Sequence, residues 1–243
     1  MSRSSGTGAR ATEVDRSEAG DSTAVLRDLV EGRWSCRSFD RKQVPRSDIE
    51  DILQIARRTP SWCNTQPWHV HITEGFATEQ LRQAIAERIS RQLTQEPDID
   101  FPAEYEGVYQ DRRRESGWQL YESLGIAKGD RVASGKQMLK NFDFFGAPHV
   151  AMITTERNLG PYGAVDCGLF VSNFLLAAHS MGIATVPQAA LAAQAPTIRE
   201  FFDIPAERQV LLGISFGYPD LGDPVNSYRT GRQSTAEVAT FIR

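Results

Sequence analysis

Apolar residues recur at helical spacing in three segments of the first ninety residues. Residues 24–31 place Val and Leu side chains on one stripe, which predicts a helix that Gly32 ends. Residues 47–58 begin with the capping-box pattern SDIE, repeat apolar positions at i, i+3, i+4 and i+7, and stop before Pro60. Residues 78–89, TEQLRQAIAERI, show the same pattern. Each segment is expected to form an amphipathic helix with one face on a core.

Other segments have the patterns of strands. Trp68, Val70 and Ile72 alternate along one face of a predicted strand. Short apolar runs predict further strands at 148–155, 183–187 and 209–219. Helices and strands interleave without a strict βαβ rhythm, and neither GxGxxG after a strand nor a P-loop is present. The pattern favours an α+β fold, with helices around one mixed sheet.

One predicted helix lacks a polar face. Residues 163–182, GAVDCGLFVSNFLLAAHSMG, are apolar on nearly every side, yet too short and too polar to cross a bilayer. Such a helix must be covered all round, by the sheet and by something else. In a chain of 243 residues, a second subunit is a reasonable cover.

The chain is expected to form one domain over residues 22–243. Residues 1–21 are rich in Ser, Gly and charged residues, so a flexible tail is expected there. They lack the apolar run of a secretory signal peptide. Residues 94–130 lose periodicity and mix charges with Tyr105, Tyr109 and Trp118. A long irregular segment in a compact domain is either a functional lid or disordered, and 94–130 is expected to be a lid segment.

Composition excludes several classes of protein. The net charge of −4 indicates no general affinity for nucleic acid or anionic membranes. Three scattered cysteines form no disulfide framework, which favours a reducing cytoplasm. The four histidines lack metal-ligand spacing, so no metal is expected. No nucleophile elbow or catalytic triad stands out, and an enzyme of this sequence would rely on a cofactor.

Three stretches carry groups that suit an anionic or flat ligand. In RWSCRSF, an extended backbone would point Arg33, Ser35 and Arg37 the same way, as a cradle for phosphate or as plain surface residues. NSYRTGR adds Arg229 and Arg232, which would either complete that cradle or lie in a solvated loop. TVPQAALAA offers backbone N–H groups among small side chains, although an ordinary loop has the same composition.

Together these stretches resemble one family. RWSCRSF resembles the R-x-S-x-R/K-x-F opening of the FMN-dependent nitroreductase family, and PSWCNTQPW resembles its most specific motif. FFGAPHVAMI, AAHSMGIATVP, GYP and a C-terminal arginine follow in the family's order, so the resemblance covers roughly residues 24–243. The tryptophan-rich motif and the long segment before FFGAP are similar to the nitrobenzoate-reductase-type branch. The iodotyrosine dehalogenases are similar relatives.

The resemblance implies a nitroreductase-like fold, a central mixed sheet flanked by helices, in an intertwined homodimer with a C-terminal arm. Two FMN sites would lie at the subunit interface. Arg33, Ser35 and Arg232 would hold the FMN phosphate, with Arg229 as a further candidate. Arg37 would lie near the N1/O2 edge of the flavin, where a cation stabilises the anionic reduced ring.

The partner subunit and one strand would complete the site by the same resemblance. Pro60, Ser61, Trp62 and Asn64 would come from the partner, with Gln66 nearby. Residues 187–190 would follow one flavin face with a backbone N–H directed at N5. Ala189, Ala190 and Thr230 depart from the acidic residue, glycine and lysine that many relatives carry. The residues expected to bind the cofactor are Arg33, Trp34, Ser35, Arg37, Pro60, Ser61, Trp62, Asn64, Gln66, Pro187, Gln188, Ala189, Ala190, Arg229 and Arg232.

The function implied is an NAD(P)H-dependent FMN oxidoreductase that reduces nitroaromatics or quinones by ping-pong hydride transfer. NADH and NADPH are not distinguished, because no 2′-phosphate pocket can be placed. Tyr105, Tyr109 or Trp118 would cover the acceptor. Three alternatives stay open: a reductive dehalogenase of halogenated phenols, a non-catalytic flavin-binding protein, and a structural dimer without a cofactor.

Overall fold

The computed structural model describes residues 16–92 and 94–243, and the chain divides after Arg33 into two compact units. The first unit contains helix α1, Arg16–Gly32, followed by Arg33. The helix therefore includes residues 16–21, which were expected to belong to a flexible tail; these polar residues lack the apolar stripe that would have predicted a helix. The rest of that expected tail, residues 1–15, lies outside the described residues.

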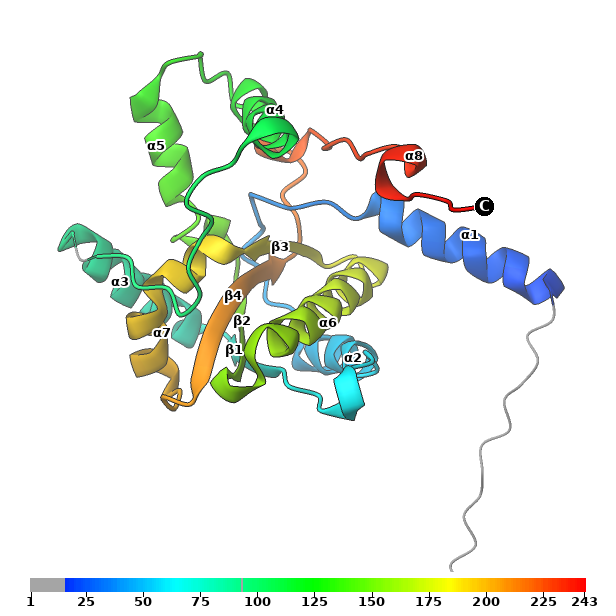
Figure 1. Cartoon of the computed structure of the whole chain (residues 1–243). Helices are drawn as coiled ribbons and strands as arrows, with labels where there is room; N and C mark the ends of the chain where they lie inside the picture. The colour runs from blue at the N-terminus through cyan, green and yellow to red at the C-terminus, as the bar shows by residue number, and fades with distance from the viewer. Residues whose placement is uncertain (1–15, 93) are drawn as a thin grey trace, which may run out of the picture. The chain divides into compact units, whose positions relative to one another are not determined.

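The second unit, residues 34–243, is built on a sheet with strand order β1-β2-β4-β3 (Figure 1). The strands are β1, His69–Thr73, β2, His149–Glu156, β3, Ala184–Gln188, and β4, Arg208–Gly217. All three strand pairings are antiparallel. The parallel component of the expected mixed sheet is limited to an isolated bridge between Ser35 and Thr185.

Alternate side chains of β2 enter two different cores, one on each face of the sheet. Val150 and Met152 pack with residues of α3, Phe76–Ser90, and α7, Ala195–Phe202. Ala151 and Ile153 pack with residues of α2, Arg46–Ala56, and α6, Gly160–Ser180. Figure 1 shows the sheet between these two helical layers. Burial on both faces explains the continuous apolar run of β2, since successive side chains point to opposite faces.

The expected irregular segment contains regular structure. Helix α4 covers Gly107–Ser123 within that segment, 94–130, and α5, Arg131–Leu139, begins directly after it. No residue of α4 is buried, and the helix has no apolar stripe. Its sequence therefore shows no hydrophobic periodicity from which a helix could be predicted. The lack of periodicity in 107–123 was therefore wrongly read as irregular backbone.

The apolar helix α6 is covered on one side within this chain. Phe170 and Phe174 are buried against the sheet, while Tyr162, Val165 and Leu169 are exposed. By length and composition alone the stretch Arg157–Ser180 could cross a membrane, which corrects the expectation that it is too short and too polar. Half of its most apolar 18 residues are buried inside the protein, as in the core helix of a globular domain.

Short helical turns connect the remaining parts. They are η1, Trp62–Asn64, η2, Phe144–Gly146, η3, Arg157–Leu159, η4, Ala189–Gln194, η5, Pro224–Asn226, and the C-terminal α8, Thr235–Val238. Turns η1 and η4 contain residues of the predicted flavin site, and η5 immediately precedes the C-terminal stretch that carries Arg229 and Arg232.

Candidate functional site

The segment that follows Arg33 lies along the edge strand β3. Ser35 forms the isolated bridge with Thr185, and the backbone N–H of Cys36 donates to the carbonyl of Thr185 at 3.0 Å. This pairing gives residues 34–37 the extended backbone expected from the sequence. Trp34, Ser35 and Arg37 are each half-buried.

The C-terminal stretch meets the same segment. Asn226 Oδ1 accepts from the backbone N–H of Arg37 at 2.8 Å, and the Arg37 guanidinium lies 5.7 Å from the ring centroid of Tyr228. The Arg229 guanidinium lies 4.3 Å from the ring centroid of Trp34. Residues separated by about 190 positions are therefore brought together at one edge of the sheet.

Two of the predicted arginines lack carboxylate partners among the described residues. Arg37 Nη1 donates to the carbonyl of Ser35 at 3.2 Å, and Arg229 Nη1 donates to the carbonyl of Asn226 at 2.9 Å. Neither guanidinium forms an ion pair in the described part of the chain. Guanidiniums without carboxylate partners are suited to bind a phosphate, and Ser35 lies two residues from Arg37 in the same segment. This set of donors fits the FMN that the family resemblance implies.

Arg232 lies elsewhere. Its guanidinium donates to the carbonyls of Thr230 and Gly231 and to Thr230 Oγ1. With Arg112 and other residues of α4, it lines a cavity of about 490 Å³. The structure thus brings Arg229, and not Arg232, to residues 34–37. Arg33 belongs to the first unit, where its backbone N–H donates to Leu29.

At the end of β3, backbone groups rather than side chains are available to a ligand. Gln188 is 3% exposed; its Nε2 donates to the carbonyl of Asn141 at 2.9 Å, and its Oε1 accepts from Ser215. Gln188 pairs in register with Gly213, where an added Cβ would lie 2.9 Å from the Met152 sulfur and would also clash with Leu191. A glycine is therefore needed for η4 to fold back against the sheet. Pro187 and Ala190 are half-buried, and Ala189 is exposed.

The loop around η1 is exposed but conformationally defined. Cys63, Asn64 and Gln66 have φ values of 51°, 56° and 48°, which non-glycine residues seldom adopt. The backbone N–H of Trp62 donates to both carboxylate oxygens of Asp166, at 3.3 and 3.1 Å. The loop's predicted site residues are mostly exposed, namely Pro60, Trp62, Asn64 and Gln66, while Ser61 is half-buried. No described contact joins this loop to residues 34–37.

The aromatic residues predicted to form a lid lie on or before α4. Tyr105 is 42% exposed and Trp118 is 40% exposed, and each ring has a cation over it, Arg113 and Lys128 respectively. Tyr109 is exposed as well. No described contact places these three rings against β3.

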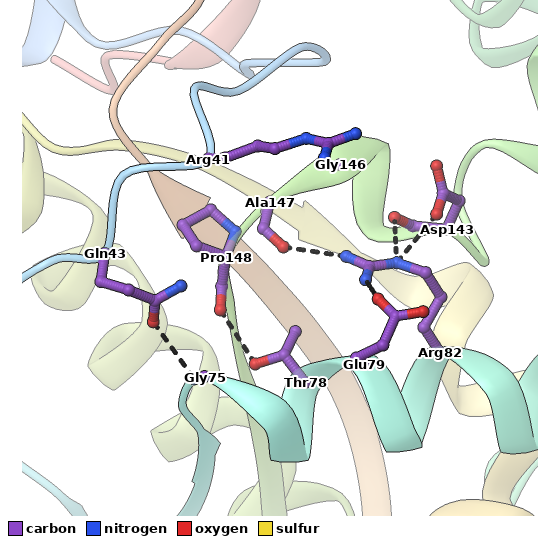
Figure 2. Close-up of a pocket in the computed structure, with 10 residues that line it drawn as sticks. All are labelled: Arg41, Gln43, Gly75, Thr78, Glu79, Arg82, Asp143, Gly146, Ala147 and Pro148. Atoms are coloured by element: carbon purple, nitrogen blue, oxygen red, sulfur yellow. Dashed lines mark hydrogen bonds and ion pairs between the residues drawn. The ribbon is translucent and has the colours of Figure 1, made fainter.

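A well-formed cavity of about 560 Å³ contains none of the predicted residues (Figure 2). It surrounds Arg82, which pairs with Glu79 and with Asp143 at 2.8 Å and donates to the carbonyl of Ala147 at 3.1 Å. Burial raises the pKa of Asp143, against the opposing effect of Arg82. Because Arg82 already has carboxylate and carbonyl partners, this cluster ties α3 to η2 and does not offer an open anion site.

Cys36 and Cys167 are buried and His71 is half-buried, whereas Cys63 is exposed. Burial raises the pKa of Cys36 and of Cys167 to about 11, so both thiols are protonated at neutral pH. Burial, followed by the nearby His69 and Arg208, lowers the pKa of His71 to about 4. Among residues 16–92 and 94–243, no group of three or more potential metal ligands is present.

Sequence reasoning missed three residues of this site. Asn226 and Tyr228 organise the backbone and side chain of Arg37, and Asn141 holds Gln188. Asn226 and Tyr228 stand inside the NSYRTGR stretch that was singled out for its arginines. No sequence signal identifies Asn141, because only the tertiary structure brings it to β3.

Comparison with known proteins identifies the family. The model of the nitroreductase family matches residues 30–218. A nitroreductase NfnB of Mycolicibacterium smegmatis is 35% identical, over 88% of this chain and 92% of its own length. A 4-nitrobenzoate reductase of Nocardioides sp. is 34% identical, over 88% of each chain. A crystal structure of the FMN-dependent nitroreductase NfnB from Mycobacterium smegmatis in complex with NADPH superposes with a TM-score of 0.87 and 33% identity, over 92% of this chain and 100% of that one. From its sequence motifs, its fold and these matches, the chain belongs to the nitroreductase family.

Proposed function

We propose that this protein is an NAD(P)H-dependent FMN oxidoreductase that reduces nitroaromatic compounds or quinones. The observation that carries the proposal is the placement of two arginines without carboxylate partners, Arg37 and Arg229, beside Ser35 and strand β3. The named relatives, one an FMN-dependent enzyme in complex with NADPH and one a nitrobenzoate reductase, support the same reading.

The chain's own residues would bind and orient the cofactor. Ser35 and Arg229 would hold the phosphate. Arg37 would sit at the N1/O2 edge of the flavin, where its charge stabilises negative charge on the ring. FMN, when bound, supplies a centre that accepts and donates a hydride. The backbone of residues 187–190 would support one face, which leaves the opposite face for the nicotinamide and then the acceptor.

Sharing one face makes the two substrates mutually exclusive. We therefore propose ping-pong kinetics, with the oxidised nicotinamide leaving before the acceptor enters. No acidic side chain is described at the end of β3, where Ala189 and Ala190 follow Gln188. Protons would accordingly come from solvent. The segment 94–130 would act as the lid over the acceptor, with Tyr105, Tyr109 or Trp118 in contact with it.

A homodimer would complete the site. Tyr162, Val165 and Leu169 of α6 and Trp62 of η1 form an exposed apolar face. A second copy packed on this face would cover α6 and bring the partner's η1 loop to the flavin. The loop's defined backbone suits that use, because little freedom would be lost on binding. We further propose that the enzyme works in the cytoplasm, where its free cysteines stay reduced.

The decisive experiment is anaerobic reduction of the purified, FMN-loaded protein with NADPH and with NADH. Each reduced sample is then mixed with a nitrobenzoate, a quinone and a halogenated phenol. We expect bleaching of the flavin absorbance by a nicotinamide, and reoxidation by the nitro compound or the quinone. Reoxidation by the halophenol alone would establish a dehalogenase instead. A protein that binds FMN without being reduced would be a flavin-binding protein, and one that ignores FMN would overturn the proposal.

A further inference from the structure

The side chain of Gln188 is enclosed and has partners on both sides. Nε2 donates to the carbonyl of Asn141 at 2.9 Å and to Asn141 Oδ1 at 3.3 Å, while Oε1 accepts from the hydroxyl of Ser215. Gln188 is 3% exposed and Ser215 is fully buried. An amide with its donors and its acceptor engaged in this way is unavailable to a ligand. Its role must therefore lie in what it connects.

Gln188 connects the sheet to the end of the α4–α5 segment. Ser215 lies on β4, inside the sheet, whereas Asn141 follows the last turn of α5. Asn141 also donates from Nδ2 to the carbonyl of Met138 at 2.9 Å, so its side chain closes that turn. One buried side chain thus joins β3, β4 and the point at which the segment containing α4 and α5 rejoins the core.

Gln188 joins the stretch proposed to lie along the flavin to an exposed apolar turn of α5. The backbone of residues 187–190 is the stretch proposed to lie along the flavin. The last turn of α5 carries Met138 and Leu139, which are 61% and 48% exposed. Hydrogen bonds from Gln188 to Asn141 hold this apolar turn at the end of β3. A shift of α5 would therefore alter the space beside the flavin face.

We propose that Gln188 is a positioning residue that holds the C-terminal turn of α5 beside the flavin-supporting end of β3, and so sets the width of the acceptor site. The inference rests on the proposed function for its catalytic consequence. The link itself is a property of the fold and is tested independently of turnover.

The variant Gln188→Met keeps an unbranched side chain of similar length but removes the donor and the acceptor. We expect amide hydrogen exchange in residues 131–141 to become about tenfold faster, because the segment loses its attachment to the sheet. The matched control is Gln209→Met, which changes another buried glutamine, on β4, whose neighbour across the sheet is Thr155. This control should leave exchange in residues 131–141 at the wild-type rate.

Kinetics test the catalytic consequence. In Gln188→Met we expect the KM for a nitroaromatic acceptor to rise about five- to tenfold, with a larger change in KM than in kcat. Ser215→Ala removes only the sheet contact and should leave exchange in 131–141 unchanged. Equal exchange in Gln188→Met and Gln209→Met would overturn the proposal, as would faster exchange with an unaltered acceptor KM.

The test also covers two failures: a Gln188→Met variant that does not fold, and a wild-type protein that neither nicotinamide reduces. If Gln188→Met fails to fold, Gln188→Asn shortens the side chain by one methylene, so that its amide no longer reaches Asn141, and it should accelerate exchange in the same residues. Wild-type exchange in Gln188→Asn would then contradict the proposal. If the wild-type protein is not reduced by either nicotinamide, the proposed function fails, while the exchange measurement still decides whether Gln188 fixes α5.

Discussion

At the residue scale, the two arginines of the C-terminal stretch have different surroundings despite their similar sequence context. Arg229 lies over the ring of Trp34, next to the segment that carries Ser35 and Arg37. Arg232 instead bonds to its own chain and lines a cavity beside α4. The family resemblance had implied Arg232 as a phosphate ligand, with Arg229 as a further candidate. The structure brings only Arg229 to residues 34–37.

We therefore predict that Arg229→Gln weakens FMN binding more than Arg232→Gln. A charge-assisted hydrogen bond contributes about 1.5–3 kcal/mol, so loss of the Arg229 contact should raise the Kd about 10- to 150-fold. Fluorescence titration of the apoprotein with FMN measures this change. Riboflavin, which lacks the phosphate, should bind wild type and Arg229→Gln equally.

The matched control is Arg41→Gln, because Arg41 is exposed and lines the cavity of Figure 2, which contains none of the residues proposed to bind FMN. This change removes the same charge and should leave the Kd for FMN unaltered. A larger loss of affinity in Arg232→Gln than in Arg229→Gln would show that the C-terminal stretch rearranges when FMN binds.

At the element scale, the connection between α3 and α4 is tied to the core by Asp98. Its carboxylate accepts from Arg157 at 2.5 Å, from Arg199, and from the backbone N–H of Val210 at 2.7 Å. The Asp98 side chain is 10% exposed and that of Arg199 is 19% exposed. Nearby, the N–H of Glu96 donates to the carbonyl of Ala193 in η4. The start of the proposed lid is therefore rigidly attached.

We predict that Asp98→Ala lowers the free energy of unfolding by about 3 kcal/mol, because it leaves the guanidinium of Arg199 partly buried without its counter-ion. Urea denaturation followed by circular dichroism measures the change. The control Asp51→Ala removes an exposed carboxylate on α2 and should cost less than about 0.5 kcal/mol. Equal effects of the two substitutions would mean that Asp98 contributes no more than a surface charge.

The elements also show where hydrophobic patterning succeeds and where it fails. Helices α2 and α3 and the strands were predicted because each buries an apolar stripe or face. Helix α4 was missed because none of its residues is buried, so its sequence carries no such stripe. Helix α1 was found only from residue 24 onward, where its apolar residues begin, although it starts at Arg16.

At the scale of the whole molecule, side chains of α6 and η1 form an apolar face that is exposed in a single chain. Val165 is 57% exposed and Leu169 is 47% exposed, next to a buried side of the same helix that packs on the sheet. A large exposed apolar patch is typical of an interaction surface. This supports the proposed homodimer, in which residues of η1 would reach the partner's flavin.

We predict that the double variant Val165→Lys, Leu169→Lys converts a dimer to a monomer and lowers FMN occupancy at the same time. Two charges in the centre of an apolar interface would be buried without partners, which is strongly unfavourable. Light scattering after gel filtration gives the mass, and the absorbance of bound flavin gives the occupancy.

The control Val132→Lys places a charge on α5, at a side chain that is 70% exposed and outside this face. It should preserve both the mass and the occupancy. If the double variant lost the dimer but kept its full flavin content, each site would be complete within one subunit, and the proposed contribution of residues 60–66 would be wrong.

By itself the sequence determined the family, the main helices and strands, and the arginine, serine and tryptophan-rich motifs proposed to bind FMN. These features are local, because motifs and hydrophobic periodicity depend only on residues that are close together in the sequence. Only the tertiary structure decided that Arg229 joins Trp34, that Asn226 and Tyr228 organise Arg37, and that Gln188 faces inward to Asn141. These contacts join residues between 47 and 195 positions apart. Packing creates them, and no local pattern encodes which distant partner a polar side chain will meet.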